Sequence, residues 1–335
     1  MEKKRKATAE LLGVEPTHDV KRQTTDSSME LQRSTLEPIL ADEYLRAVDT
    51  VAVYIARIED RRQTSRLVKS LSDALPLGDQ QHLKRVRCTS KGMDIILHAV
   101  KGGDLAGTQT LKGVLGETFD AQGLSAEVRV VQVPRHPPLT RAQFEQSNCL
   151  WPTQFHEDKH IARVLSGKLF SDQERATMEN YMALAVTAAQ KSRAGIGVAV
   201  VNPSTERVLV VAVGDGKHPL RHATMVAIDL VARQQGGGAW PVPPGCEMCN
   251  ITQHDLEVGS KVPYLCTGYD FYISHEPCTM CGMALVHSRV RRVFYGQATP
   301  WGALGTCHKL HVQPGLNHHF EVWRGLLRRR TEVVT

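Results

Sequence analysis

One histidine and two cysteines stand at a spacing that suits a metal ion. Cys278 and Cys281 form a C-x-x-C pair at the start of one helical pattern, and His222 begins another. Both thiols then face one side of the first helical turn, where Pro277 is tolerated because it has no N–H to leave unpaired. Catalytic zinc takes three nitrogen or sulfur ligands and keeps a fourth position open. The pattern predicts one Zn²⁺ per chain; the alternative is a buried histidine and two unconnected cysteines.

The residues around these ligands resemble the H-x-E … P-C-x-x-C signature of zinc deaminases. The resemblance to tRNA adenosine deaminases covers roughly residues 155–325. It is carried by His218-Pro219-Leu220-Arg221-His222-Ala223, by Glu276-Pro277-Cys278-Thr279-Met280-Cys281-Gly282-Met283-Ala284-Leu285, by His287-Ser288-Arg289-Val290 and by Val293-Phe294-Tyr295-Gly296. It implies a cytidine-deaminase-like three-layer α/β/α domain.

The position two residues after the histidine departs from that signature. Active deaminases carry there the glutamate that moves protons between the zinc-bound water and the base, whereas this chain has Thr224. A hydroxyl near neutral pH is a poor acid and a poor base, and general acid–base help is worth about 10²- to 10⁴-fold. Glu276 is interpreted as structural because active relatives carry it too, and Asp229 lies more than one helical turn away. No catalytic residue is therefore predicted.

The loop before His222 departs as well, because active relatives place an asparagine there to hold the substrate and residues 214–217 offer no counterpart. Together with Trp151-Pro152-Thr153, the pattern resembles the non-catalytic subunits of eukaryotic tRNA wobble-adenosine deaminases. That resemblance implies a heterodimer with a catalytic deaminase subunit, tRNA as the substrate, adenosine-to-inosine conversion at the first anticodon position, and a place in nucleus and cytoplasm. Two alternatives stay open: an active deaminase with an unrecognised proton shuttle, or an RNA-binding module with structural zinc.

The amino-terminal half predicts an α+β ferredoxin-like domain over residues 49–134. Strand patterns at residues 51–55, 82–88, 93–100 and 126–133 alternate with helical patterns at 60–75 and 105–119. This order of strand, helix, strand, strand, helix, strand is the split βαβ arrangement, which leaves one sheet face uncovered by helices. Residues 1–48 are polar and predict a disordered arm, and the prolines of residues 135–153 predict a linker.

The second domain is predicted over residues 154–335. Two helical stretches end near residue 193, a hairpin spans 196–213, and a helix begins at His222 with an apolar stripe of i, i+3, i+4, i+7 spacing. A flexible insertion is predicted at residues 236–264. It contains a second pair, Cys246 and Cys249, for which a second zinc with His254 or Cys266 competes with free thiols.

Basic side chains favour a polyanionic partner. The net charge of +6 permits nucleic acid without demanding it. Lysine and arginine supply the salt-dependent attraction to phosphate, and the alternative is a solvated charged face. The predicted RNA contacts are Arg61, Arg62, Arg66, Lys69, Lys84, Arg85, Arg87, Arg328, Arg329 and Arg330.

The composition is that of a globular protein, with 335 residues and 41% hydrophobic content. No apolar stretch of about 18 residues is present, so no membrane span is expected. The basic run at residues 3–6 allows two interpretations, a nuclear import signal or a solvated tail.

Overall fold

The computed structural model describes residues 36–100, 110–248 and 264–331, which form two separate sheets. None of the helices in these ranges is long and apolar enough to cross a membrane. The strands are β1 (Glu37–Pro38), β2 (Thr50–Ile58), β3 (Val86–Thr89), β4 (Gly92–Ala99), β5 (Leu124–Pro134), β6 (Gly197–Asn202), β7 (Arg207–Val213), β8 (Glu247–Met248), β9 (Asp270–His275), β10 (Arg292–Gln297) and β11 (Glu321–Arg324). The α-helices are α2 (Asp42–Leu45), α3 (Thr64–Ala74), α4 (Leu111–Leu115), α5 (Arg141–Leu150), α6 (Lys159–Leu165), α7 (Asp172–Lys191), α8 (Ala223–Gln234), α10 (Thr279–His287) and α11 (Arg328–Thr331).

The first sheet has the strand order β3-β4-β2-β5 with every neighbouring pair antiparallel. With α3 between β2 and β3 and α4 between β4 and β5, this is the expected ferredoxin-like topology. Leu67 and Leu71 of α3 pack with Tyr54, Ile95 and other residues of the strands in one apolar cluster. The predicted helix at 105–119 is short here, since Thr110 caps α4 and residues 101–109 lie outside the described ranges.

The opposite face of this sheet corrects the prediction of a linker at residues 135–153. Trp151 is fully buried against Val53, Ile55 and Ile96, and its indole N–H donates to the Lys84 carbonyl at 2.6 Å. Residues 141–150 form α5, which begins with a capping box at Thr140. The prolines stand only outside this helix, so they frame it and do not disrupt it. The segment is part of the fold of the first sheet.

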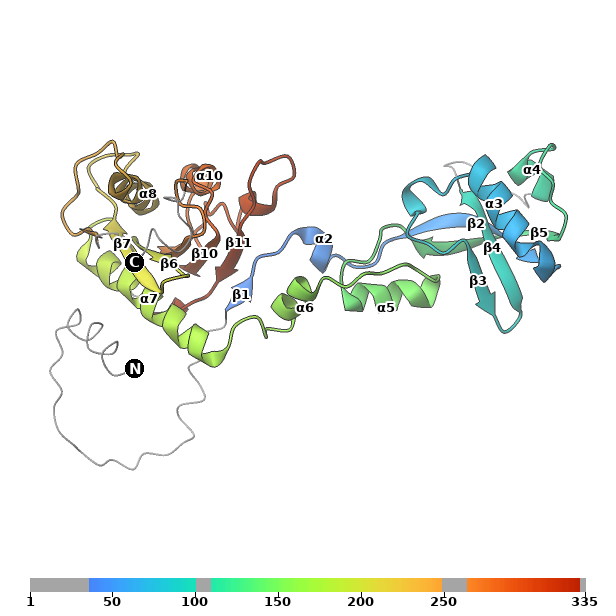
Figure 1. Cartoon of the computed structure of the whole chain (residues 1–335), viewed down its shortest axis with the longest axis horizontal. Coiled ribbons are helices and arrows are strands. Elements are labelled where there is room, and N and C mark those ends of the chain that lie inside the picture. Colours follow the sequence, from blue (N-terminus) through green and yellow to red (C-terminus); the bar gives the residue numbers. More distant parts are fainter. Residues whose placement is uncertain (1–35, 101–109, 249–263, 332–335) are drawn as a thin grey trace, which may run out of the picture. The chain divides into compact units, whose positions relative to one another are not determined.

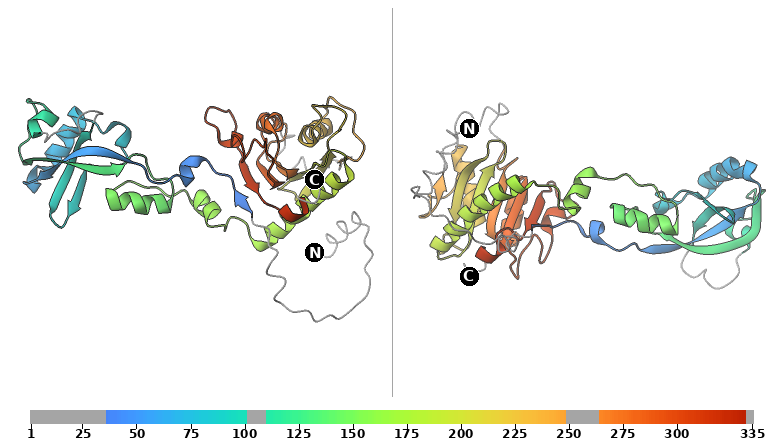
Figure 2. Two further views of the ribbon diagram at one scale, coloured as in Figure 1. Left: turned by 180° about the vertical axis from the view of Figure 1, so that it is seen from behind. Right: turned by 90° about the horizontal axis from the view of Figure 1, so that it is seen from below.

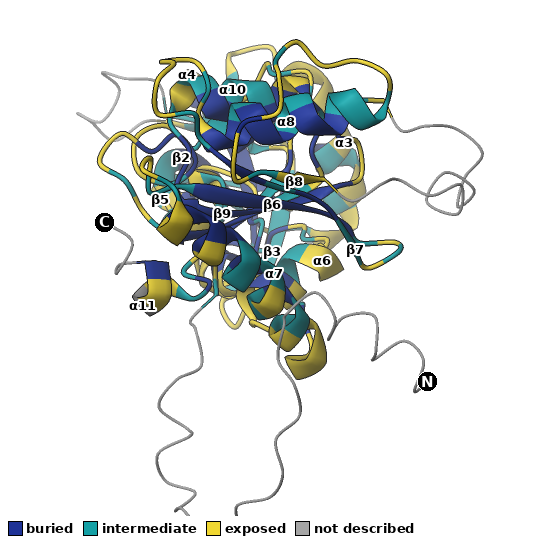
Figure 3. Ribbon diagram, turned by 90° about the vertical axis from the view of Figure 1, so that its left-hand side faces the viewer, coloured by how far each residue is buried: buried dark blue, intermediate teal, exposed yellow. Residues whose placement is uncertain are grey.

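The second sheet has the order β1-β11-β10-β9-β6-β7-β8. Strands β9, β10 and β11 run parallel, whereas β6 and β7 form an antiparallel hairpin. Helix α7 lies on one face of the sheet and helices α8 and α10 lie on the other, as the opposite views show (Figures 1 and 2). The faces of α8 and α10 that meet the sheet are buried, and their outer faces are more exposed (Figure 3). This is the expected three-layer α/β/α domain.

The end of the predicted disordered arm belongs to this second sheet. Strand β1 pairs antiparallel with β11, and Ile39 is buried in the core beneath α8 and α10. His311 Nε2 lies 2.9 Å from the Ile39 carbonyl, and Lys309 contacts the Leu40 carbonyl at 3.0 Å. The arm prediction was therefore wrong for residues 36–48, because tertiary pairing holds a segment that has no pattern of its own. Residues 1–35, including the basic run, lie outside the described ranges.

We expect Trp151→Ala to lower the free energy of unfolding by about 3–5 kcal/mol, because the substitution leaves a large cavity under the first sheet. The matched control is Trp301→Ala, because Trp301 is 67% exposed and surface substitutions usually change stability by less than about 0.5 kcal/mol. Urea-induced unfolding of both variants measures the difference. Equal losses would contradict the anchoring role of Trp151.

Candidate metal centre and its cavity

His222, Cys278 and Cys281 come together as predicted. His222 is the N-cap residue of α8, and Cys278 is the N-cap residue of α10. His222 Nδ1 lies 3.5 Å from Cys278 Sγ and 3.6 Å from Cys281 Sγ. Tetrahedral zinc with Zn–N bonds of about 2.05 Å and Zn–S bonds of about 2.3 Å places nitrogen and sulfur about 3.6 Å apart. The donor set and its spacing therefore fit zinc, and within the described ranges it is the single such group of histidine, cysteine and acidic residues.

The electrostatics of the site favour thiolates. The amino-terminal ends of α8 and α10 both point at it, and their partial positive charge stabilises anions. Without a metal the two cysteines share one proton: the Cys281 thiol donates a hydrogen bond to Cys278, which lowers the pKa of Cys278 to about 5 and raises the pKa of Cys281. The Thr224 hydroxyl contacts Cys281, and this contact opposes the rise in the pKa of Cys281. Thr224 thus supports a ligand sulfur.

A cavity of about 840 Å³ opens beside the three ligands. Its floor is formed by the ligands and Thr224, and Trp301 lies at its rim as one of the most exposed large apolar side chains. Among its described lining residues, the carboxylates are Asp215 and Glu276. Whether either one is available to carry protons decides what chemistry the cavity supports.

The Glu276 carboxylate is engaged by the loop that follows β10. It accepts hydrogen bonds from the backbone N–H groups of Leu304, Gly305 and Thr306 at 3.0, 2.6 and 3.0 Å, and from the Thr306 hydroxyl at 2.5 Å. A Cβ at Gly302 would lie 2.0 Å from the Glu276 carboxyl carbon, so only glycine fits there. Glu276 holds the loop, which agrees with its structural interpretation.

Asp215 is engaged within the loop that lacks the asparagine. Its carboxylate pairs with Arg221 Nη1 at 3.0 Å, and Arg221 also lies over the Trp240 ring at 5.3 Å from the centroid. A hydrogen bond from the Lys217 backbone, helped by Arg221, holds the pKa of Asp215 below its ordinary value. Asp229 also has a structural contact, since it accepts from the Ala239 backbone N–H at 2.5 Å. None of the three acids replaces the missing glutamate.

The second cysteine pair gains no further ligands within the described ranges. The Val213 backbone N–H donates to Cys246 Sγ at 3.5 Å, and Cys266 is buried in the apolar core, where burial raises its pKa to about 12. Cys249 and His254 lie outside the described ranges. A second zinc therefore remains a prediction that these contacts do not support.

Two of the predicted RNA contacts are structural. Arg85 is 8% exposed and donates to the carbonyls of Leu75, Ile96 and Leu97, and its burial lowers its pKa to about 10. Arg87 pairs with the buried Asp94 and lies 4.4 Å over the Trp151 ring centroid. Both side chains are used by the fold, which the sequence did not indicate, because alternation along a strand does not show which side chains turn back into the protein.

The remaining predicted RNA contacts differ in how many interactions their side chains make within the protein. Arg66 pairs with Asp120 at 2.8 Å and donates to the Gln122 carbonyl at 2.6 Å, so it is largely used by the fold. The side chain of Arg329 is not among those described. The exposed members of the set are Arg61, Arg62, Lys69, Lys84, Arg328 and Arg330.

Sequence patterns missed one group of functional interest. Arg57 and Arg129, on two other strands, converge with Arg87 on Asp94. Arg57 is the one charged residue of β2 and Arg129 is the one basic residue of β5, so clusters of basic residues along the chain do not indicate them. Only the alternation of strands β2, β4 and β5 carries a hint that these side chains share a face.

We expect Glu276→Gln to lower the free energy of unfolding by roughly 1.5–3 kcal/mol, because hydrogen bonds to a charged acceptor are lost or weakened. Glu145→Gln, on an exposed position of α5, is the matched control. Chemical denaturation measures both variants. A Glu276→Gln protein as stable as the control would show that the carboxylate does not fasten the loop.

Comparison with known proteins finds a matching family model for each half of the chain. The family model described as the tRNA-specific adenosine deaminase TAD3 N-terminal domain matches residues 51–151, and the cytidine and deoxycytidylate deaminase zinc-binding region matches residues 172–297. "Probable inactive tRNA-specific adenosine deaminase-like protein 3" of Danio rerio is 44% identical over 310 residues, covering 87% of this chain and 91% of the relative.

Two further relatives carry related names. The Homo sapiens protein with the same name is 42% identical over 317 residues, covering 88% of this chain and 90% of its own. The "tRNA-specific adenosine deaminase subunit tad3" of Schizosaccharomyces pombe is 31% identical over 220 residues, covering 63% of this chain and 64% of its own. With this similarity extending across both sheets, the chain belongs to the family of tRNA-specific adenosine deaminase-like protein 3, also called TAD3.

Proposed function

We infer that this chain is the non-catalytic subunit of a heterodimeric tRNA adenosine deaminase, in which it supports the active subunit and positions tRNA for conversion of the wobble adenosine to inosine. The observation that carries this inference is the state of the cavity. Thr224 stands at the proton-shuttle position, and both carboxylates that line the cavity, Asp215 and Glu276, are held by other groups. The family membership supplies the partner and the substrate class.

The missing group is required by the chemistry. Deamination needs a proton taken from water at the zinc and a proton delivered to the base, and one carboxylate performs both transfers in active deaminases. Bound zinc would lower the pKa of water to about 7. In this chain the residue at that position is Thr224, whose hydroxyl is a poor acid and a poor base near pH 7 and so does not replace the carboxylate.

Zinc is proposed here as a structural element. His222 belongs to the start of α8, and Cys278 and Cys281 belong to the start of α10, so one ion would cross-link two helices that pack on the same sheet face. Structural zinc binding contributes on the order of 10 kcal/mol to folding. The ion would keep the domain in the shape that its partner recognises.

The central test is co-expression with a deaminase chain that retains the glutamate. The two chains should co-purify and together form inosine in tRNA. This chain alone, at any concentration tested, should form no inosine above background. Inosine formed by the chain alone at an appreciable rate would refute the non-catalytic assignment. Failure to pair with any such deaminase would favour the RNA-binding module with structural zinc.

One observation favours a rival, the active deaminase with an unrecognised shuttle. His275 lines the cavity, and its Nε2 is buried without a hydrogen-bond partner within the described ranges. Burial lowers the pKa of His275, which keeps the imidazole neutral near pH 7. If the chain alone were active, His275→Gln should abolish that activity, and this variant distinguishes the rival from contamination by a bound partner.

We expect Thr224→Glu in the lone chain to restore little or no deamination. The substitution supplies the carboxylate, but the loop at residues 214–217 has no asparagine and is closed by the pair of Asp215 and Arg221. Inosine formation on tRNA measures the outcome. Recovery to within about 10²-fold of an active relative would show that a proton shuttle, worth about 10²- to 10⁴-fold, was all that the cavity lacked.

We expect Cys281→Ser to reduce the zinc content from one ion per chain to near zero and to weaken assembly with the catalytic subunit. Cys281 is the buried sulfur ligand, and a serine hydroxyl is a poor zinc ligand at neutral pH. Cys149→Ser, at an exposed position of α5, is the control. Metal analysis and co-purification measure the effects, and normal assembly and editing by Cys281→Ser would rule out the structural role of zinc.

A further inference from the structure

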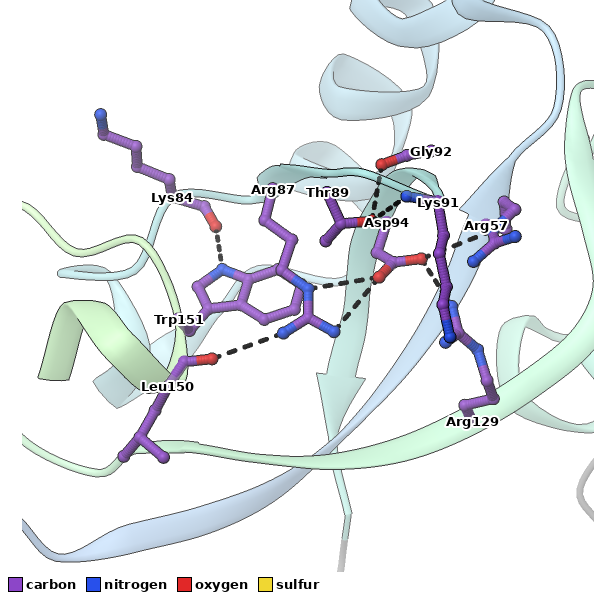
Figure 4. Close-up of polar contacts among 10 residues, drawn as sticks. All are labelled: Arg57, Lys84, Arg87, Thr89, Lys91, Gly92, Asp94, Arg129, Leu150 and Trp151. Carbon is purple, nitrogen blue, oxygen red and sulfur yellow. Dashed lines mark hydrogen bonds and ion pairs between the residues drawn. The ribbon is translucent and has the colours of Figure 1, made fainter.

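A buried carboxylate gathers three arginines on the face of the first sheet opposite α3, the face that Trp151 also contacts (Figure 4). Asp94 of β4 is 2% exposed. It lies 3.9 Å from Arg57 Nε of β2, 3.2 Å from Arg87 Nη2 of β3 and 2.5 Å from Arg129 Nη2 of β5. Four strands thus each contribute one charged side chain to one cluster, which we call the Asp94 cluster.

The Asp94 cluster keeps an excess of positive charge. Three guanidinium groups face a single carboxylate, and arginine stays protonated in proteins, so two positive charges are not compensated within the cluster. Two further charges belong to the strands and turn around the cluster. Glu127 is the one acidic residue of β5, and the exposed Lys91 lies in the turn between β3 and β4.

The three arginines are not equivalent. Arg87 lies over the Trp151 ring, also donates to the Leu150 carbonyl at 3.4 Å, and has a side chain only 22% exposed, so it serves the fold. The side chains of Arg57 and Arg129 are 37% and 34% exposed. Arg57 Nε is buried but forms no hydrogen bond within the described ranges, and its 3.9 Å approach to Asp94 is too long for one. The buried Nε is closed to a ligand, so the partly exposed ends of the Arg57 and Arg129 side chains are the parts that a ligand can reach.

We propose that Arg57 and Arg129 form a binding site for RNA phosphate groups on the face of the first sheet opposite α3, with Asp94 and Arg87 as positioning residues. The proposal rests on the non-catalytic tRNA deaminase subunit inferred above and names the surface that it uses. Arginine matches phosphate with two parallel hydrogen bonds, and Asp94 holds the guanidinium groups in place before the RNA arrives. Structured RNA is read largely through its backbone and shape, for which fixed cations on a sheet suffice.

This assignment moves the predicted RNA surface from one side of the sheet to the other. The sequence had singled out Arg61, Arg62, Arg66 and Lys69, which belong to α3 and the turn before it. These residues lie on the side where α3 covers the sheet, whereas the Asp94 cluster shares its face with the buried Trp151. Charge-matched substitutions on the two sides can therefore be compared directly.

The test uses the full chain co-purified with its catalytic subunit and measures tRNA binding over a range of KCl concentrations. The double substitution Arg57→Gln and Arg129→Gln should lower the slope of log K against log[KCl] by about 1.5, since each lost phosphate contact removes about 0.7–0.9. The double substitution Arg61→Gln and Arg62→Gln removes the same charge from the helix side and should lower the slope by less, since Arg62 is paired with Asp60. Arg57→Lys with Arg129→Lys should restore the slope, because a lysine still neutralises a phosphate.

Folding does not confound the comparison. Asp94 keeps its contact with Arg87 in the glutamine variant, so the buried carboxylate remains paired, and an unchanged melting temperature verifies this. An unchanged slope overturns the site, and so does an equal fall in both double variants, which reports net charge alone. Normal RNA binding with loss of the catalytic subunit would identify the face as a protein contact and would also overturn it. If the wild-type pair bound no tRNA, the proposed function itself would fail instead.

Discussion

The second sheet depends on two helices that begin at the same point. Helices α8 and α10 pack on one face of the sheet, and their first residues, His222 and Cys278, meet at a nitrogen–sulfur distance of 3.5 Å. Helix starts carry partial positive charge, so bringing two of them together is unfavourable unless anions or a metal–thiolate group lies between them. Thiolate groups of the cysteines at this candidate metal site would thus offset the positive charge of the two helix starts, independently of any reaction. This explains why the ligands can persist when the proton-carrying residue does not.

The acidic residues around the cavity likewise have structural roles that do not depend on a reaction. Glu276 fastens the loop at residues 299–306 through backbone N–H groups, and Asp215 closes the loop before His222 by pairing with Arg221. Each carboxylate is held in place by several contacts with loop residues, which suits a structural role and suits an acid–base catalyst poorly. The residue that would need to change its protonation in every cycle is the one that Thr224 replaces. Its loss leaves the contacts of the fold intact.

The sequence predicted the features that depend on local patterns and missed those that depend on contacts between distant segments. The metal ligands and the order of strands and helices follow from spacing and period, and they agree with the structure because those signals are local. Trp151 anchors the first sheet, and Ile39 lies in the core of the second, although both were predicted to lie outside the domains. Strands β1 and β11 were missed because each is short and is defined by its partner. Such segments gain order from residues far away in the chain, which no window of sequence contains.

Charge is the property that the sequence describes least completely. Arg85 and Arg87 lie in the same basic stretch as Lys84, yet one is buried among carbonyls and the other is held by Asp94 and Trp151. Arg57 and Arg129 are each the one basic residue of their strand, yet the sheet brings them together. A basic side chain is available to a ligand only when the acceptors that the fold places beside it do not use all of its donors. In the first sheet one buried carboxylate faces three guanidinium groups, and the surplus positive charge lies on the face opposite α3.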